Sequence, residues 1–269
     1  MKPEKRPYGQ TALITGASSG IGEALAHCFA AARFDLVLVA RSEDALKLLA
    51  TALEQKHGVC VNVQIADLSR ADVPAQLAAT LKRQRRVVDV LVNCAGVLAQ
   101  GAFMNLSSAQ HQNIIDLNIS GLTAMLGAFV PGMVQRGHGK VLNVASVAAF
   151  QPVPTLACYA ASKAYVLSLS ESLSEELRGT GVTVTALCPG ITATPMLQLA
   201  TNSNNKLSRL PGFLVGSVDQ VAARAYAACM KGDAVCVPGV FNQATMIASR
   251  GTPKWLVRRL GGLLGRQAI

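Results

Sequence analysis

The stretch QTALITGASSGIG, residues 10–22, decides the fold of this chain. A short apolar run of strand type, residues 11–14, ends in small residues, and a segment of helix-forming composition, residues 21–32, follows. The turn between them holds three glycines: Gly16, Gly20 and Gly22. Such a turn suits an anion, because a phosphate can approach a backbone without Cβ atoms and the helix N-terminus offers N–H groups. The alternative is a tight strand-to-helix turn without a ligand.

Length and composition are those of one layered α/β domain. The chain has 269 residues, of which 51% are apolar and only 4% aromatic, which is enough for one aliphatic core. Its formal net charge of +10 comes mostly from dispersed side chains, whereas nucleic-acid binding usually requires concentrated charge with a supporting motif. We therefore expect a single domain over residues 1–269 and no nucleic-acid partner.

Cysteine usage and hydropathy indicate the compartment. Seven cysteines are scattered and show no CxxC spacing, which favours reduced thiols in the cytoplasm and argues against a zinc site. Residues 1–9 are charged and contain proline, so no signal peptide is expected. No run of about 18 uncharged apolar residues, the length of a membrane span, is expected either. These features predict a soluble cytoplasmic protein without a metal.

Apolar runs alternate with helix-like segments along the rest of the chain. Six further runs have strand character, at residues 35–40, 60–65, 88–93, 140–145, 182–188 and 234–237. Alternation at this spacing implies parallel strands joined by right-handed crossovers. The pattern predicts a doubly wound parallel α/β sheet of about seven strands, with helices on both faces.

Two side chains at the ends of predicted strands are candidates for contacts with a bound nucleotide. Arg41 directly follows the run at residues 35–40, which ends without an acid. In dinucleotide folds an acidic residue here holds the ribose 2′-hydroxyl, whereas a basic one accommodates a 2′-phosphate. This favours NADP(H) over NAD(H), although a surface arginine at a helix start is the alternative. Asp67 follows the third strand and could either accept from an adenine amino group or cap a helix.

A YxxxK pair carries the chemistry. Tyr159 and Lys163 lie in a segment with apolar residues at helical spacing, residues 158–178, and positions i and i+4 share a helix face. A free tyrosine has a pKa of about 10, and a nearby cation lowers that pKa toward the working pH. Ser146 ends the fifth strand, where open α/β sheets bind ligands. These residues predict a proton-transfer site.

Asn118 lies among apolar residues within residues 106–136, which read as two long helical stretches. A buried amide must find partners, because leaving it unsatisfied costs about 1–3 kcal/mol. From the residues alone, a hydrogen bond between helices is the favoured interpretation.

Taken together, these motifs resemble the short-chain dehydrogenase/reductase family, single-domain branch, over about residues 8–238. The resemblance is carried by the order and spacing of the TGxxxGxG turn, the segment at residues 93–96, Asn118, Ser146, the YxxxK pair and Pro189-Gly190. One departure is Cys94, which replaces the second asparagine of the family's NNAG segment. The resemblance implies a Rossmann-type fold and hydride transfer between a nicotinamide and a carbonyl or secondary alcohol.

The resemblance also implies residue roles. Tyr159 would exchange a proton with the substrate oxygen, Lys163 would lower the pKa of Tyr159 and hold the nicotinamide ribose, and Ser146 would bind the substrate oxygen. Asn118 would anchor a water of a proton relay. The implied cofactor contacts are Gly16, Ser18, Ser19, Gly20, Ile21, Gly22, Arg41, Asp67, Leu68, Asn93, Ala95, Gly96, Tyr159, Lys163, Pro189, Gly190, Ile191 and Thr194.

Two segments bear on substrate and partners. Residues 195–216 form a polar loop of a length typical of a lid, and its apolar residues favour an apolar ketone, a 3-oxoacyl group or a lipid-like substrate. Residues 254–266, KWLVRRLGGLLGR, form a basic amphipathic stretch. This tail, within residues 250–269, would either lie on an anionic membrane or pack on the domain or a partner subunit.

The family resemblance implies a homodimer or homotetramer that pairs through residues 107–136 and 158–178. A non-catalytic NAD(P)-binding sensor or scaffold on the same fold is the alternative function. The intact Asn118, Ser146, Tyr159 and Lys163 set favours the enzyme, because a sensor does not need an activated phenol.

Overall fold

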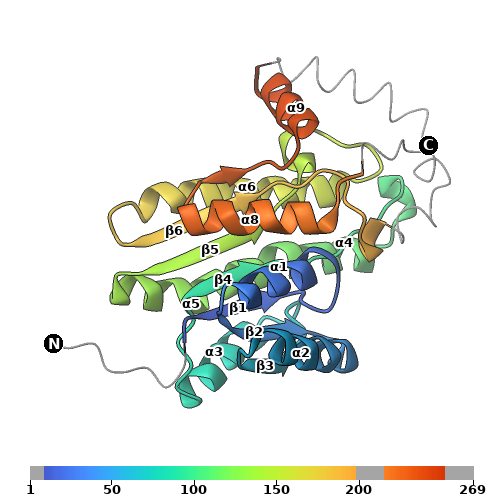
Figure 1. Cartoon of the computed structure of the whole chain (residues 1–269). Coiled ribbons are helices and arrows are strands. Elements are labelled where there is room, and N and C mark those ends of the chain that lie inside the picture. Colours follow the sequence, from blue (N-terminus) through green and yellow to red (C-terminus); the bar gives the residue numbers. More distant parts are fainter. Residues whose placement is uncertain (1–8, 198–214, 252–269) are drawn as a thin grey trace.

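The computed structural model describes residues 9–197 and 215–251, and seven parallel strands within them form one sheet (Figure 1). The strand order is β3-β2-β1-β4-β5-β6-β7, so the order reverses between β1 and β4. The strands are β1 (Thr11–Thr15), β2 (Asp35–Ala40), β3 (Val61–Ile65), β4 (Val90–Asn93), β5 (Gly139–Val144), β6 (Val182–Leu187) and β7 (Val235–Cys236). This is the predicted doubly wound sheet, and every predicted strand is present with ends shifted by at most two residues.

Helices cover both faces of the sheet (Figure 1). One apolar core lies under α1 (Gly20–Ala31), α2 (Glu43–His57) and α8 (Val218–Lys231). A second core lies under α3 (Val73–Arg83), α5 (Leu122–Arg136) and α6 (Ala157–Glu176). Buried parallel strands have apolar side chains on both faces, which explains continuous runs such as DLVLVA in β2.

The longest helical stretch, residues 108–136, is continuous. It comprises α4 (Ser108–Ile115), a π-helical turn η2 (Asp116–Gly121) and α5. By length and composition this stretch could cross a membrane, with a mean hydropathy of 1.5, so the expectation that no such run exists was wrong. Its buried positions include Leu126, Val130 and Met133, which belong to the second core. The apolar composition therefore serves packing against the sheet.

The last described helix, α9 (Val240–Gly251), was not predicted. It follows Gly239, which has a φ of +91° that favours glycine. The Asn242 and Gln243 side chains donate to the carbonyls of Pro238 and Val237, at 2.7 and 3.0 Å. The tail at residues 252–269 and most of the predicted lid, residues 198–214, lie outside the described residues.

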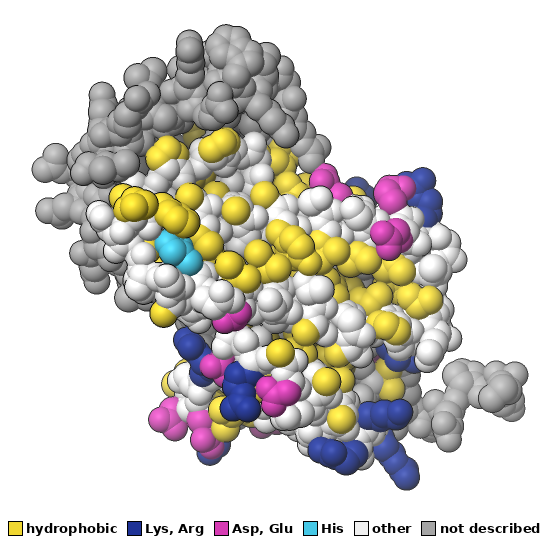
Figure 2. All heavy atoms as spheres, turned by 180° about the vertical axis from the view of Figure 1, so that it is seen from behind, with side chains coloured by type: hydrophobic (Ala, Val, Ile, Leu, Met, Phe, Trp, Pro, Cys, Tyr) yellow, Lys and Arg dark blue, Asp and Glu magenta, His cyan; other side chains and the backbone are white. Residues whose placement is uncertain are grey.

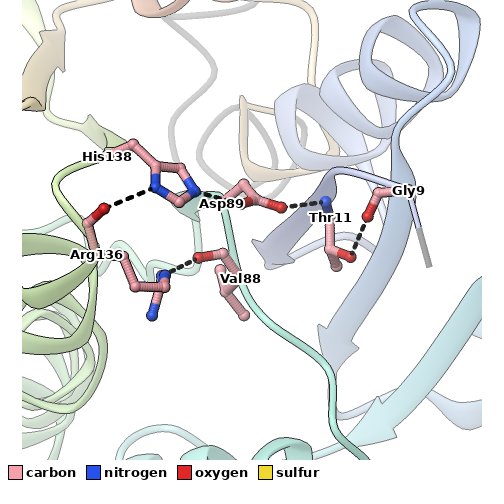
Figure 3. A network of polar contacts seen from close by, with 6 residues as sticks. All are labelled: Gly9, Thr11, Val88, Asp89, Arg136 and His138. Atoms are coloured by element: carbon pink, nitrogen blue, oxygen red, sulfur yellow. Dashed lines mark hydrogen bonds and ion pairs between the residues drawn. The ribbon is translucent and has the colours of Figure 1, made fainter. Parts of the chain in front are cut away.

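The amino-terminal edge of the sheet is held by a network around Asp89 (Figure 3). The Asp89 carboxylate is only 4% exposed; it accepts from the Thr11 backbone N–H at 2.9 Å and pairs with His138 Nε2 at 3.1 Å. His138 Nδ1 faces the Arg136 carbonyl at 3.2 Å, and the Arg136 guanidinium donates to the Val88 carbonyl. The network links the starts of β1, β4 and β5.

Candidate active site

The glycine turn after β1 is shaped so tightly that side chains are excluded. Gly16 and Gly20 have φ values of +64° and +59°. A Cβ on Gly22 would lie 2.2 Å from the Gly16 carbonyl oxygen, and a Cβ on Gly16 would lie 2.9 Å from the Ala95 backbone. The N-cap residue of α1, Ser19, makes no capping hydrogen bond with its side chain. The turn and the helix N-terminus can therefore present backbone donors to an anion.

The Thr15 hydroxyl joins this turn to the loop after β4. Its oxygen accepts from the N–H groups of Cys94 and Ala95, at 2.9 and 3.0 Å, and donates to the Val92 carbonyl. The hydroxyl thus fixes the residues 93–96 segment beside the glycines. The Cys94 thiol has a pKa raised to about 12 by burial, so at neutral pH it is a neutral side chain.

Arg41 and Asp67 lie at the carboxyl ends of the neighbouring strands β2 and β3. Arg41 is exposed and contributes to lowering the pKa of Asp67, although the main cause is hydrogen bonding from Ser69. Asp67 Oδ1 accepts from the Ser69 hydroxyl and N–H, at 2.7 and 3.1 Å. The N-cap position of α3 is occupied by Asp72, so the alternative that Asp67 caps this helix was wrong.

Tyr159 and Lys163 lie one turn apart on α6, as the sequence predicted. Lys163 Nζ is 5.6 Å from the centre of the Tyr159 ring and donates to the Val144 carbonyl at 2.8 Å. The Lys163 residue is only 5% exposed. Gly96 borders the same ammonium, because a Cβ there would lie 3.5 Å from Lys163 Nζ. The last residue of β5 and the loop after β4 therefore both border the lysine.

Burial dominates the electrostatics of this pair. It lowers the pKa of Lys163 to about 8, against smaller opposing effects of the Cys94 and Cys188 thiols. Burial also raises the pKa of Tyr159, while a hydrogen bond with the Ser146 side chain acts in the opposite direction. The sequence led us to expect a Tyr159 pKa lowered by Lys163. In this structure burial has the largest effect and the pKa of Tyr159 is raised, with no contribution from Lys163, so that expectation was wrong.

Ser146 lies just beyond β5, as expected, and is the N-cap of a short helix, η3 (Val147–Phe150). Its oxygen accepts from the Ala148 N–H at 3.1 Å while its side chain hydrogen-bonds Tyr159. The serine is therefore held by backbone on one side and faces the phenol on the other.

Asn118 lies in the π-helical turn η2 and is 1% exposed. Its amide accepts from the Val97 N–H at 2.9 Å and donates to the Val97 carbonyl and to the Ser162 hydroxyl, at 3.0 and 3.1 Å. Ser162 in turn donates to the Tyr159 carbonyl. Single π-turns occur frequently at functional sites, and here the turn directs an amide at both the β4 loop and the tyrosine helix.

Two buried amides lie in the sheet beside the site. Asn93 is 3% exposed and its side chain donates to Asn143 Oδ1 at 2.9 Å, and its predicted contact with the cofactor stays a prediction. Asn143 continues the chain by donating to the Ser170 hydroxyl of α6. Sequence reasoning missed Ser162 and Asn143; Ser162 could have been found, because it lies three residues after Tyr159 on the same helix face.

The turn after β6 completes the site. A Cβ on Gly20 would lie 3.1 Å from the Thr194 side chain, so this turn lies directly over the start of α1. The Thr194 hydroxyl donates to the Thr192 carbonyl, and Ile191 is 37% exposed. The glycine turn, the β4 loop, Ser146, the α6 pair and this turn all meet at the carboxyl edge, next to the point where the strand order reverses.

Comparisons with known proteins agree with this arrangement. The model of the short chain dehydrogenase family matches residues 10–205. The chain belongs to the short-chain dehydrogenase/reductase family. As a member of this family, the protein is an oxidoreductase.

Three similar proteins illustrate the likeness. Oxidoreductase UcpA of Salmonella typhimurium is 36% identical over 198 residues, covering 73% of this chain and 74% of UcpA. A short-chain dehydrogenase from Sphingobium yanoikuyae, solved in complex with NADPH, has a TM-score of 0.81 at 35% identity over 90% of this chain and 93% of that one. The bulky-bulky ketone specific alcohol dehydrogenase of Comamonas testosteroni has a TM-score of 0.76 at 29% identity, with 92% and 96% covered.

Proposed function

We propose that this short-chain dehydrogenase/reductase is an NADP(H)-dependent carbonyl reductase that acts on an apolar ketone, a 3-oxoacyl group or a lipid-like carbonyl. The observation that carries the proposal is the convergence of Ser146, Tyr159, Lys163 and Asn118 beside a glycine turn that excludes Cβ atoms. A sensor on the same fold would not require a lysine and a tyrosine buried at the cost of their solvation.

The residues of the glycine turn fit the pyrophosphate of a dinucleotide. Backbone donors at the start of α1 lie where side chains cannot intrude, and Ser18, Ser19 and Ile21 belong to the same turn. Arg41, exposed at the end of β2, would hold a ribose 2′-phosphate, and Asp67 would accept from the adenine amino group. The backbone of Leu68, and the turn at Pro189, Gly190, Ile191 and Thr194, would flank the two ends of the cofactor.

Residues of the chain itself would donate the proton and replace it. When bound, the reduced cofactor supplies a hydride to the carbonyl carbon. Tyr159 donates its proton to the carbonyl oxygen, and Ser146 donates a hydrogen bond to that oxygen as charge develops on it. Lys163 holds the nicotinamide ribose and its ammonium stabilises the tyrosinate that results. Asn118 positions the β4 loop and anchors a water through which the proton is replaced.

The raised pKa of Tyr159 fits its proposed role as the proton donor in reduction. Because burial raises that pKa, the phenol is protonated at neutral pH, which is the form that a proton donor requires. Oxidation of an alcohol would begin from the tyrosinate, which burial disfavours.

The substrate class rests on two observations. Ile191 is 37% exposed beside the site, and Met196 and Leu197 follow on the same segment. The Comamonas testosteroni structure is named for bulky ketones, which supports a large carbonyl substrate here. The remaining apolar residues of the predicted lid lie outside the described residues.

The cofactor preference is tested by titration of the purified protein with NADPH and NADH, followed by nicotinamide fluorescence. Arg41→Ala should weaken NADPH binding about tenfold or more, because a charge-assisted contact with the 2′-phosphate is lost, and should leave NADH binding unchanged. Arg83→Ala, an exposed arginine on α3, serves as the control. Equal weakening of both cofactors, or no weakening, would contradict the role of Arg41.

A homodimer or homotetramer is part of the proposal. Ile115 of α4 and Tyr165 of α6 are each 37% exposed, and Phe129 of α5 and Leu169 of α6 are only partly buried. Figure 2 shows apolar side chains forming a broad band across the face opposite to that seen in Figure 1. Sedimentation equilibrium measures the assembly directly. Seven free thiols support a cytoplasmic location.

A further inference from the structure

A buried amide interrupts the apolar layer between β5 and α6. Alternate side chains of a strand point to the same face of the sheet, and Val141 and Ala145 of β5 belong to the second core. Asn143 lies between them in the sequence and is fully buried. An amide in such a layer is unfavourable unless its polar groups are bonded, and an aliphatic side chain would pack there without needing partners. Packing alone therefore does not account for Asn143.

Asn143 links the sheet to α6 through hydrogen bonds that all run in one direction. The Ser170 hydroxyl donates to the Val166 carbonyl at 2.6 Å, and its oxygen accepts from Asn143 Nδ2 at 2.9 Å. Asn143 Oδ1 is thereby turned toward β4, where it accepts from Asn93 Nδ2 at 2.9 Å. Both ends of the Asn143 amide are used, and bonds in such a chain strengthen one another in a protein interior. The chain of bonds joins β4, β5 and α6.

The two elements joined by Asn143 and Ser170 carry the groups that must meet in the active site. Ser146 follows β5 directly, three residues after Asn143. Lys163 and Ser170 are both buried positions of α6 and lie about two turns apart on one helix face. The hydrogen bond between Asn143 and Ser170 therefore relates the strand that ends near Ser146 to the helix that carries Tyr159 and Lys163.

Other contacts of α6 fix its position along β5 less well. Apolar contacts such as those of Val166 and Leu167 are non-directional, so they tolerate a small shift along the helix axis. Lys163 bonds the Val144 carbonyl of β5 through a long flexible stem, which can follow such a shift. A second polar contact, from Ser162, bonds Asn118 of η2 and not β5. The bond between the two short side chains of Asn143 and Ser170 is the contact that resists sliding.

We propose that Asn143 and Ser170 are positioning residues: their hydrogen bond sets α6 along β5 so that the Tyr159 phenol meets Ser146 and the substrate carbonyl. The proposal rests on the proposed function, because it takes Tyr159 as the proton donor. Neither residue touches the reacting atoms. A displacement of about 1 Å between reacting groups can lower turnover by about 100-fold, so a small slide of α6 is enough to impair the reaction.

The test compares Ser170→Ala, Ser170→Val and Ser170→Thr in NADPH-dependent ketone reduction, with kcat expressed per folded molecule from urea denaturation. The threonine and valine variants add the same methyl group, but only threonine keeps the hydroxyl. The two variants without a hydroxyl should lose about tenfold or more in kcat with KM for the ketone unchanged, since the lost alignment matters in the transition state. Ser170→Thr should stay close to wild type.

Two further variants sharpen the comparison. Asn143→Leu should lower kcat as Ser170→Ala does, and the two changes combined should lower it no further, because either one breaks the same bond. Thr185→Val is the control on the neighbouring strand β6. Thr185 is fully buried, its hydroxyl has no hydrogen-bond partner in the described part of the chain, and its neighbours Val184 and Ala186 face the second core, so its own side chain points away from α6. It should leave kcat unchanged.

The position of the phenol can also be followed without turnover. Ultraviolet titration of Tyr159, with Tyr159→Phe in each background as the blank, gives the pH midpoint of its ionisation. That midpoint depends on burial and on the hydrogen bond with Ser146. It should therefore move in Ser170→Ala and Ser170→Val and stay at the wild-type value in Ser170→Thr and Thr185→Val.

Three results would overturn the proposal. They are a wild-type kcat in Ser170→Ala, equal losses of kcat in Ser170→Thr and Ser170→Val, and an unchanged phenol midpoint in the variants without a hydroxyl. Equal losses in the threonine and valine variants would assign Ser170 to packing alone. A wild type that oxidises no NADPH with any ketone would refute the proposed function, while the phenol midpoints would still decide whether the bond between Asn143 and Ser170 positions Tyr159.

Discussion

The buried charged groups at the two edges of the sheet differ in their hydrogen-bond partners. At the amino edge, the nearly buried Asp89 has a backbone N–H and a histidine as partners, and the neighbouring groups bond in turn to backbone carbonyls (Figure 3). At the carboxyl edge, Lys163 is buried with a single carbonyl as its hydrogen-bond partner among the described residues, and burial displaces its pKa to about 8. Strands β1, β4 and β5 contribute to both edges.

The difference shows how stability and chemistry are divided along the same strands. A buried carboxylate with complementary partners ties strand starts together. A buried ammonium and a buried phenol without ionic partners are poised to exchange protons and to bind charge. We therefore expect substitutions at the amino edge to change mainly stability, and substitutions at the carboxyl edge to change mainly turnover.

The largest effect is expected from Tyr159→Phe. Without the phenol the carbonyl oxygen receives no proton, so kcat for NADPH-dependent ketone reduction should fall by about 10²–10⁴-fold. The affinity for NADPH, measured by nicotinamide fluorescence, should change little. Tyr165→Phe is the control on the same helix, since the Tyr165 hydroxyl lies 2.9 Å from that of Thr123, away from the site. Turnover by Tyr159→Phe within a factor of a few of wild type would refute the assignment.

A smaller, purely structural effect is expected at the other edge. Asp89→Ala removes the acceptor of the Thr11 N–H and the partner of His138, so the free energy of unfolding should fall by about 1–3 kcal/mol. Urea denaturation measures this loss, and kcat per folded molecule should stay at the wild-type value. Asp44→Ala, at an exposed position of α2, should change stability by less than about 0.5 kcal/mol. A drop in kcat for Asp89→Ala would contradict the expectation that the amino edge affects stability and not turnover.

The sequence predicted the architecture well because repeated strand and helix patterns determine it. The strand run 35–40 coincides with β2, and the YxxxK spacing did place Tyr159 and Lys163 together on α6. The sequence did not predict how far the site residues are removed from solvent. The spacing suggested that Lys163 lowers the pKa of Tyr159, whereas burial raises that pKa. Burial depends on all the loops that meet at the carboxyl edge, and no local pattern contains it.

The missed helix α9 has a related cause. Val240, Phe241 and Ile247 are exposed, and Met246 is the residue of this helix that packs against the second core, so its contribution to the core is small. A pattern of apolar residues that pack on the domain does not reveal a helix whose larger apolar residues are mostly exposed. The prediction of a catalytic role for Asn118 likewise came only from the family resemblance, because its π-helical turn has no signature in the apolar pattern.

The central claim is that the poorly solvated Lys163 at the carboxyl edge serves the chemistry and lowers the stability of the fold. The free energy of unfolding of Lys163→Met tests this claim most directly. The folded pKa of Lys163 is about 8 against 10.5 for the free side chain, so below pH 8 the unfolded chain is favoured by its better-solvated ammonium. As the pH rises from about 8 to 10.5 the unfolded chain binds more protons than the folded one, and this penalty is relieved.

Urea denaturation of wild type, Lys163→Met and the exposed control Lys82→Met should be compared at pH 7 and near pH 10. The account predicts that Lys163→Met is inactive yet more stable than wild type at pH 7 by about 1–2 kcal/mol, with the difference shrinking toward pH 10. The control should show no such pH dependence. A Lys163→Met protein that is less stable than wild type at pH 7 would contradict the account.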